Sequence, residues 1–233
     1  MTQSNATRGH ETHPVPTTAV RLPSTTVSAS PNWSGSLWIA AREGSGASLA
    51  NGAGQLSGSQ AGFRVYRALT PTIALTGRVS TALAAKGTEA SAGIALRRGA
   101  FAVLAERRFA LDSGGRNDWS LTGVAGVSDV ELPLRARLDG YVQAGVVGRD
   151  IFADGALRVE RTMLENGSNR VSLGAGTWGS IQPGIARLDV GPQVVARMKI
   201  ADRPIRLSAE WRQRIAGNAA PNSGPVVTLG ADF

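Results

Sequence analysis

The chain has 233 residues, 42% of them hydrophobic, which is enough to form one closed domain. It contains no cysteine, and this excludes a disulfide framework, thiolate metal sites and cysteine nucleophiles. The formal net charge of +8 comes from two lysines and 23 arginines set against 17 acidic residues, a balance that brings nucleic acid into consideration as a partner.

Residues 1–31 are rich in Thr, Ser and Pro, contain no aromatic residue and show no helical or strand periodicity. We interpret them as a flexible tail or linker. This segment also lacks the apolar core of a secretory signal peptide, so we expect that the true start lies upstream or that the chain is the carboxy-terminal part of a larger secreted protein. All twelve aromatic residues lie beyond Asn32, so we place a domain over residues 32–233.

From Asn32 onward, apolar and polar residues alternate with a period of two, as in half-buried β-strands. No run of 18 or more apolar residues occurs, so no transmembrane helix is expected. Strands of roughly 9 to 15 residues suit a membrane barrel, because strands in soluble sheets average about five or six. The alternation predicts twelve strands, near 32–42, 58–68, 73–84, 89–97, 101–110, 117–128, 132–147, 150–163, 169–180, 185–199, 205–216 and 224–233.

The charged residues of these segments fall on one face. In the segment 73–84, Ile73, Leu75 and Val79 lie on the face opposite Arg78. Charged groups facing hydrocarbon at mid-depth cost about 2 to 4 kcal/mol each, so this segregation suits a barrel with its apolar face toward lipid. The alternative is a soluble β-sandwich or barrel with the apolar face inside. The apolar faces are built from Ala, Gly, Val and Leu, which would fill a wide soluble interior poorly.

The other face of the strands carries an excess of arginine, with fourteen positive and eight negative residues directed inward on this register. Guanidinium groups bind carboxylate, sulfate and phosphate in two-point contacts, so such a wall favours anions. The alternative is that arginine and acidic neighbours pair across strands and fill a closed interior. The candidate lumen and selectivity residues are Arg64, Arg78, Arg135, Arg137, Arg158, Arg197, Arg206, Arg212 and Arg214.

Catalytic and cofactor sites are not expected. The only histidines, His10 and His13, lie in the tail, so the predicted strands lack the general base that barrel hydrolases and proteases use. We therefore predict that the chain is not an enzyme and holds no cofactor or metal. Gly174, Gly176 and Gly179 match the G-x-G-x-x-G pattern, but they lie inside a period-two segment and not at the start of a helix, so no nucleotide site follows.

The last ten residues, GPVVTLGADF, place Val227, Leu229, Ala231 and the terminal Phe233 on one face. With the repeated strands, this ending resembles the bacterial outer-membrane β-barrels, and the resemblance covers residues 32–233. It implies an all-β, closed, antiparallel up-and-down transmembrane barrel of about twelve strands in outer-membrane lipid. It further implies that Phe233 belongs to an assembly signal for the barrel-assembly machinery, and that the carboxy terminus is periplasmic.

Strand number, size and the arginine-rich lumen are also similar to the small porins that pass acidic oligosaccharides, and loosely to the carboxy-terminal barrels of polysaccharide exporters. Our first hypothesis is a passive pore or export channel for anionic solutes such as acidic saccharides. The second is a closed structural anchor or translocator barrel, with its interior sealed by pairs of arginine and acid. A nucleic-acid-binding role is disfavoured, because the arginines are spread over many strands without an aromatic platform.

Overall fold

The computed structural model describes residues 32–43 and 58–233, and these residues form a barrel of twelve strands. The prediction of a tail over residues 1–31 lies outside the described residues. Each of the twelve strands expected from the sequence is confirmed, with ends shifted by a few residues. The strands are β1 Trp33–Arg42, β2 Gln60–Ala68, β3 Ile73–Ala82, β4 Glu89–Arg98, β5 Phe101–Ala110, β6 Trp119–Leu132, β7 Ala136–Val147, β8 Asp150–Asn166, β9 Asn169–Gln182, β10 Ile185–Ile200, β11 Arg203–Gly217 and β12 Gly224–Asp232.

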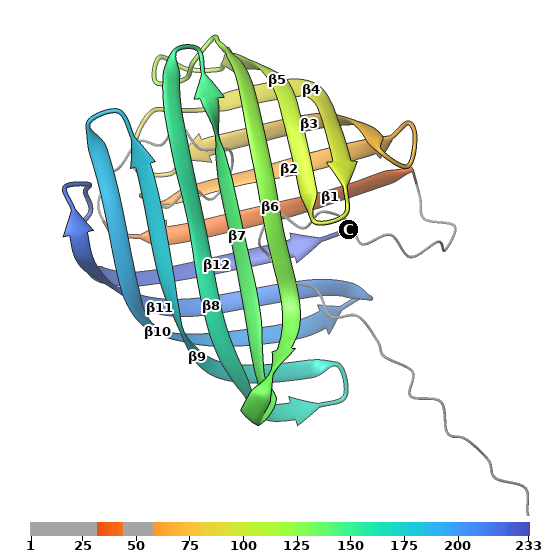
Figure 1. The fold of residues 1–233 in the computed structure, drawn as a ribbon, viewed down its shortest axis with the longest axis vertical. Coiled ribbons are helices and arrows are strands. Elements are labelled where there is room, and N and C mark those ends of the chain that lie inside the picture. Colours follow the sequence, from red (N-terminus) through yellow and green to blue (C-terminus); the bar gives the residue numbers. More distant parts are fainter. Residues whose placement is uncertain (1–31, 44–57) are drawn as a thin grey trace, which may run out of the picture.

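Every strand pairs antiparallel with its neighbours in sequence, and β12 returns to pair with β1, which closes the barrel (Figure 1). The closing ladder runs from Ser36 opposite Asp232 to Arg42 opposite Val226. Phe233 adds one more rung, because its backbone N–H and C=O bond those of Gly35 at 2.9 and 2.8 Å. A Cβ on Gly35 would lie 2.5 Å from the Phe233 ring, so the glycine makes room for the terminal aromatic side chain.

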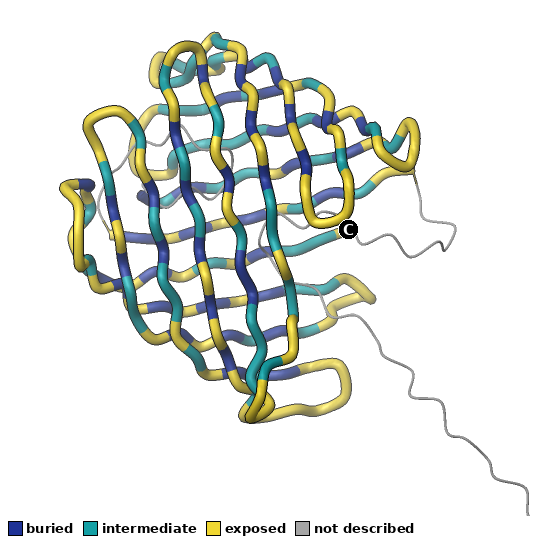
Figure 2. The backbone as a smooth tube through the Cα atoms, in the orientation of Figure 1, coloured by how far each residue is buried: buried dark blue, intermediate teal, exposed yellow. Residues whose placement is uncertain are grey.

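Burial alternates along the strands (Figure 2), and the exposed positions carry the large apolar side chains. Leu75, Ile94 and Leu207 are exposed on the outside, whereas the neighbouring Thr76, Ser91 and Ser208 are buried inside. This is the surface of a transmembrane barrel, apolar outside and polar inside, so the soluble alternative with an apolar interior is wrong. Among the described residues, no helix is both long enough and apolar enough to cross a membrane.

Seven aromatic side chains point outward. They are between 43% and 67% exposed, and several stand at strand ends, where membrane barrels carry interfacial girdles of aromatic residues. The set is Trp33, Phe63, Phe101, Phe109, Trp119, Trp211 and Phe233. Arginines accompany some of them: the Arg67 guanidinium lies 5.5 Å from the Trp33 ring, and that of Arg107 lies 5.8 Å from the Trp119 ring. Trp38 and Trp178 are buried on the inner wall instead.

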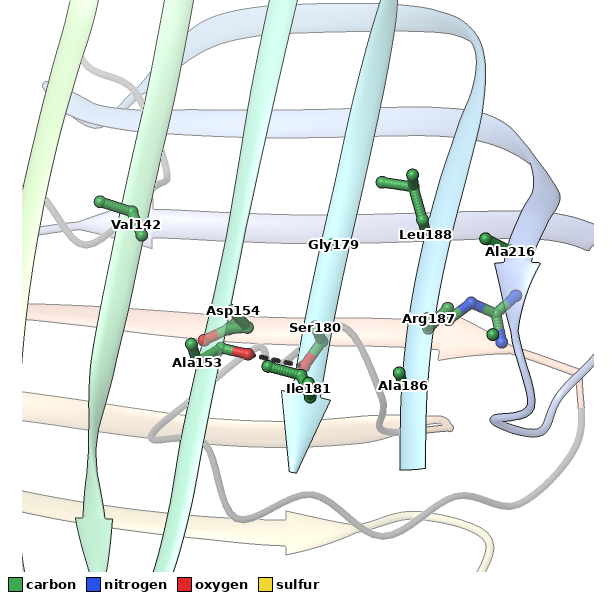
Figure 3. Close-up of a pocket in the computed structure, with 11 residues that line it drawn as sticks. Val142, Ala153, Asp154, Gly179, Ser180, Ile181, Ala186, Arg187, Leu188 and Ala216 are labelled. Carbon is green, nitrogen blue, oxygen red and sulfur yellow. Dashed lines mark hydrogen bonds between the residues drawn. The ribbon is translucent and has the colours of Figure 1, made fainter. Parts of the chain in front are cut away.

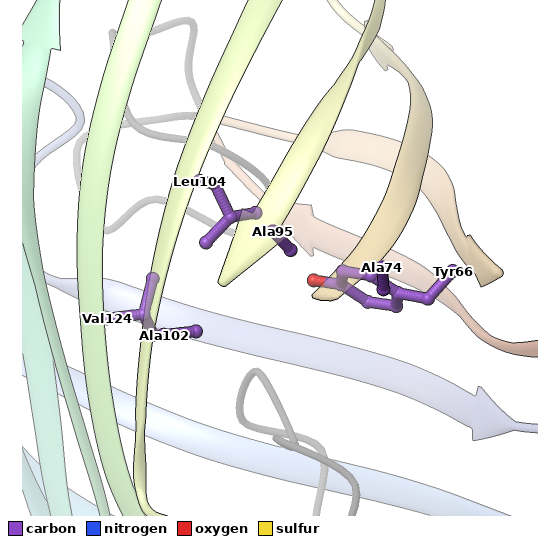
Figure 4. Close-up of a cluster of buried hydrophobic side chains, with 6 residues drawn as sticks. All are labelled: Tyr66, Ala74, Ala95, Ala102, Leu104 and Val124. Atoms are coloured by element: carbon purple, nitrogen blue, oxygen red, sulfur yellow. The ribbon is translucent and has the colours of Figure 1, made fainter. Parts of the chain in front are cut away.

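Part of the inner wall is apolar. Figure 4 shows this cluster on β2 to β6, with the Tyr66 ring beside Ala74 and with Leu104 near Ala95. Ala102 and Val124 complete it. These small side chains and one aromatic ring pack where the lumen of a wide pore would be hydrated, so this part of the interior is filled.

The connection between β6 and β7 corrects one candidate site residue. The sequence predicted strands over 117–128 and 132–147, but β6 continues to Leu132 and a single turn, Pro133–Arg135, separates it from β7. Proline cannot donate a ladder hydrogen bond, and Leu134 and Arg135 have φ of 63° and 58°, so pairing stops here. Arg135 is exposed in this turn and does not line the lumen.

The β8–β9 hairpin also differs from expectation, because β8 continues past residue 163 to Asn166. No glycine or proline occurs between residue 163 and Gly167, which has φ of +59° in the tight turn. Glycine adopts this left-handed conformation at little cost, so β8 ends there and the chain turns into β9. Gly174, Gly176 and Gly179 lie within β9, as the period-two pattern predicted.

Outward residues of β7 to β11 leave a shallow hollow of about 380 Å³ on the barrel wall (Figure 3). Small side chains make it, among them Ala153, Gly179 and Ala186, with Val142 and Leu188 at its sides. The Ser180 hydroxyl donates a hydrogen bond of 3.3 Å to the Ala153 carbonyl, so this polar side chain is satisfied within the wall.

Candidate functional site

The interior of the described barrel buries many charged side chains and is the candidate site. Ten arginines and seven acidic residues of the described chain are buried there, an excess of three positive charges. The inward faces of β1 to β5 and β7 to β11 supply these residues, because polar residues alternate with apolar residues along each strand. The arginines are Arg42, Arg64, Arg78, Arg108, Arg158, Arg170, Arg187, Arg197, Arg206 and Arg212, and the acids are Glu89, Glu106, Asp139, Asp154, Glu160, Asp189 and Glu210.

The sequence-predicted lumen residues divide into three groups. Most lie buried in the interior, as expected: Arg64, Arg78, Arg158, Arg197, Arg206 and Arg212. Arg137 and Arg214 are half-buried near strand ends, and Arg135 is outside. The candidate set did not include Arg42, Arg108, Arg170 and Arg187, although the same alternation places Arg42, Arg108 and Arg187 on the inner face. The contribution of the nine candidate arginines to solute selectivity stays a prediction.

Glu106 is the centre of one interior network, on the β2 to β5 side. Arg64 binds its carboxylate with both terminal nitrogens, at 2.7 and 3.2 Å. Thr76 and Ser91 also contact Glu106 Oε1, at 3.5 and 3.3 Å. A two-point guanidinium contact supported by hydroxyl groups satisfies a buried carboxylate and fixes both side chains.

Glu89 is the centre of a second network. Arg108 Nε donates to its carboxylate at 2.9 Å, and Arg78 lies at ion-pair distance, 3.9 Å. The backbone N–H of Arg116 donates to the other carboxylate oxygen at 2.8 Å. This network therefore joins the inner wall to the connection between β5 and β6.

Arg197 joins three strands through two acids. It binds Asp139 on β7 at 2.8 Å and also pairs with Glu160 on β8. Asp139 accepts a further hydrogen bond from the Asp129 backbone at 2.8 Å, and the Asp129 carboxylate pairs with Arg170 at 3.1 Å. One guanidinium thus neutralises two buried carboxylates of the inner wall.

The connection 218–223 between β11 and β12 folds over one end of the barrel, and we call its contacts the mouth network. The Arg187 side chain points from β10 toward β11 (Figure 3). It donates to Asp189, also on β10, at 2.5 Å, and to the carbonyls of Pro221 and Asn222 in the loop. Arg42 on β1 contacts Asp189 and the Asn222 carbonyl, each at 3.4 Å. The loop is therefore tied to the wall from β1 and from β10.

A third arginine strengthens the mouth network. Arg214 on β11 donates to the Ala219 carbonyl and to the Asn222 side chain, the latter at 2.8 Å. Ala219 itself is buried. Because three guanidinium groups donate to the carbonyls of one short loop, this loop is held against the inner wall at β1, β10 and β11.

Trp178 on β9 lies between two arginines, and we call Arg158, Trp178 and Arg212 the tryptophan stack. The Arg212 guanidinium lies 4.6 Å from the ring centroid and that of Arg158 lies 6.0 Å from it, distances at which a cation is attracted to the ring face. Arg212 donates to Glu210 from Nε and Nη2, at 2.8 and 2.5 Å. Sequence reasoning missed Trp178, although it shares the inward face with Ser172 and Ser180.

Outside the strands, Asp112 ties two loops together. Its carboxylate accepts backbone hydrogen bonds from Thr88 at 2.9 Å, Gly87 at 3.1 Å and Gly114 at 2.8 Å. These bonds, those from Thr88 first, hold the pKa of Asp112 far below its ordinary value. Because the pKa is lower in the folded chain, this contribution to loop stability is present above about pH 4 and is lost as pH falls below the ordinary aspartate pKa.

We expect Asp112→Asn to increase hydrogen exchange at the Gly87 and Thr88 amides near neutral pH, because an amide oxygen accepts these bonds less strongly than a carboxylate. The difference from the wild type should shrink as pH falls into the acid range. Exchange measured by mass spectrometry over a pH series checks this. Equal protection in the two proteins at neutral pH would contradict it.

No protein-family model matches the chain, and no curated protein matches it. The chain is similar to three solved structures. An outer-membrane channel from Pseudomonas putida F1 is 13% identical, with a TM-score of 0.45 over 86% of this chain and 94% of that one. LpxR from Salmonella typhimurium is 9% identical, with a TM-score of 0.37 over 86% and 99% of the two chains. A loop L8 deletion mutant of OmpT, an outer membrane protein of Vibrio cholerae, is 12% identical, with a TM-score of 0.25 over 86% and 97%.

These structures correct one expectation. The sequence argument predicted that the chain is not an enzyme, because the predicted strands carry no histidine. The similar structures include LpxR, an outer-membrane barrel enzyme, and this finding contradicts the prediction. The absence of histidine from the strands excludes only those chemistries that need a histidine there. In the described part of the chain, no three His, Cys, Asp or Glu side chains are grouped so that they could hold a metal ion.

Proposed function

We propose that this chain is an outer-membrane barrel with a sealed interior, and that it acts as an anchor and not as an open diffusion pore. The observation that carries this proposal is the burial of charge in the interior. Side chains such as Glu106, Asp139 and Asp189 have no solvent exposure at all, although they lie on the inner wall, where a wide lumen would hydrate them. The apolar outer surface and the general likeness to outer-membrane barrels support the location.

Two further features support a sealed interior. The inner-wall carboxylates are ion-paired across strands, as in Arg64 with Glu106 and Arg197 with Asp139. The mouth network holds residues 218–223 against the inner wall at one end of the barrel. A barrel of this kind would hold an attached domain or partner at the membrane and would keep the membrane closed to ions.

Planar-bilayer recording tests the proposal. We expect the folded, heat-modifiable protein to insert without a stable current. Replacing Arg187 by alanine removes contacts of the 218–223 loop and should produce intermittent current, because that loop then loses a main attachment. Arg98→Ala, which removes an exposed charge elsewhere, should stay silent. A stable open-channel current in the wild type would overturn the sealed interior.

The excess of three buried arginines over acids favours a second candidate, a gated passage for anionic solutes such as acidic saccharides. Guanidinium groups along a wall lower the energy of an anion in the interior. In this case, the Arg187→Ala current should prefer anions, and adding Arg158→Gln should shift its reversal potential toward that of a neutral pore. A current without ion preference would count against this candidate.

A further inference from the structure

We propose that the tryptophan stack and Gln193 form a binding site for an oxyanion, such as the carboxylate of an acidic saccharide or a sulfate group. The inference rests on the inward direction of the interior arginines, which the second candidate function also uses. It does not depend on whether a current flows.

Three buried polar side chains on the neighbouring strands β8, β9 and β10 have atoms without hydrogen-bond partners in the described barrel. Gln193 on β10 is 3% exposed, and both its amide nitrogen and its amide oxygen lack a partner. Arg158 lacks a hydrogen-bond partner at Nε and Nη1, and Trp178 lacks one at Nε1. Buried polar atoms in proteins are nearly always bonded, so three such groups on adjacent strands indicate a ligand that accepts hydrogen bonds.

The strand register places these groups side by side. Arg158 on β8 lies opposite Gly176 on β9, and Gly176 in turn lies opposite Gly191 on β10, two residues before Gln193. Gly176 has no side chain, and the Trp178 ring covers it: a Cβ there would lie 2.7 Å from that ring and 3.3 Å from the Arg158 side chain. The glycine therefore allows the tryptophan to lie flat on the wall between the two arginines.

The charge balance also favours an anion. Glu210 on β11, directly opposite Gln193, is the acid that pairs with both arginines of the stack, and Arg212 binds it at 2.8 and 2.5 Å. Arg158 is only at ion-pair distance from the same carboxylate, with Nε at 3.8 Å, which is too long for a hydrogen bond. One carboxylate thus faces two guanidinium groups, and an oxyanion would supply the second negative charge.

The site lies next to the mouth network. Asp189, which binds Arg42 and Arg187 there, lies directly opposite Trp178 on the neighbouring strand. Arg212 lies opposite Gly224, the first residue of β12 after the 218–223 loop. An anion that passes this loop therefore meets the stack first.

Tryptophan fluorescence of the full chain in detergent micelles tests the proposal, with sodium sulfate and sodium glucuronate as probes. Sodium chloride at equal ionic strength and glucose serve as references. We expect a saturable change with one or both oxyanions, absent in Trp178→Phe. A response to glucuronate alone identifies a carboxylate site, and a response to sulfate as well identifies a general oxyanion site.

Two substitutions separate binding from folding. Gln193→Leu removes an amide without a partner and should leave the barrel folded, yet it should weaken oxyanion binding at least about tenfold, the size of one charge-assisted hydrogen bond. Arg158→Gln should weaken binding further, whereas Arg98→Gln should bind like the wild type. Binding by calorimetry that is unchanged in Gln193→Leu, or no saturable binding to the wild type, would overturn the site. A silent wild-type bilayer would leave it standing, because binding requires no current.

Discussion

Replacing Arg197 by alanine should destabilise the barrel by about 3 to 5 kcal/mol, the cost of breaking a buried ion pair by removing one partner. This guanidinium contacts Asp139 at 2.8 Å and also pairs with Glu160, and both acids are buried. Its removal leaves two carboxylates near each other in the wall without their shared cation. Urea unfolding in lipid vesicles, followed by fluorescence, measures the loss.

A matched control and a rescue make this result specific. Arg98→Ala removes one exposed positive charge and should change the free energy of unfolding by no more than about 0.5 kcal/mol. Adding Asp139→Asn and Glu160→Gln to Arg197→Ala should recover part of the loss, because the uncompensated charges are then gone. A loss below about 1 kcal/mol for Arg197→Ala would mean that water reaches these acids and that the interior is not sealed.

The second large effect concerns the outer surface. Ile94 lies outward near the middle of β4, 48% exposed, between Leu75 on β3 and Ala105 on β5. Ile94→Arg should destabilise the barrel in lipid by about 2 to 4 kcal/mol, because the guanidinium group would face hydrocarbon. Vesicle unfolding measures this as well.

The matched control is Leu111→Arg, just past the end of β5, where the expected cost is about 0 to 1 kcal/mol, as for charges near the membrane interface. In a soluble barrel, both exposed positions would accept arginine with little change. Equal, small effects at the two positions would therefore contradict the membrane assignment.

The sequence was sufficient to predict the class of fold, because a period of two survives in every strand. The faces could also be oriented, since alanine, glycine, valine and leucine cannot fill a wide interior. Arg64, Arg158 and Arg206 were placed inside by the same alternation. The local alternation of apolar and polar residues thus predicts the fold and the direction of most arginines.

The remaining features depend on contacts that alternation does not encode. Arg197 and Asp139 are 58 residues apart and meet only through the register of four strands. Arg135 was misplaced because Pro133 ends the ladder and the next two residues adopt positive φ. The position of the Trp178 ring likewise depends on Gly176, because the ring lies where a side chain at residue 176 would be. A sealed interior could therefore be considered from the sequence, but not chosen over an open one.

The most direct test of a lipid-embedded, sealed barrel uses two neighbouring residues on β6. Leu121 is 51% exposed and faces outward, and Thr122 is 1% exposed and faces inward. The natural chain has no cysteine, so Leu121→Cys and Thr122→Cys each provide one site for a spin label. Electron paramagnetic resonance in lipid vesicles then compares collisions with oxygen, which dissolves in lipid, and with a water-soluble nickel chelate. We expect the label at 121 to meet oxygen and not nickel, and the label at 122 to be shielded from both. Nickel access at 122 would show an open lumen, and nickel access at 121 would show that this face is not in lipid.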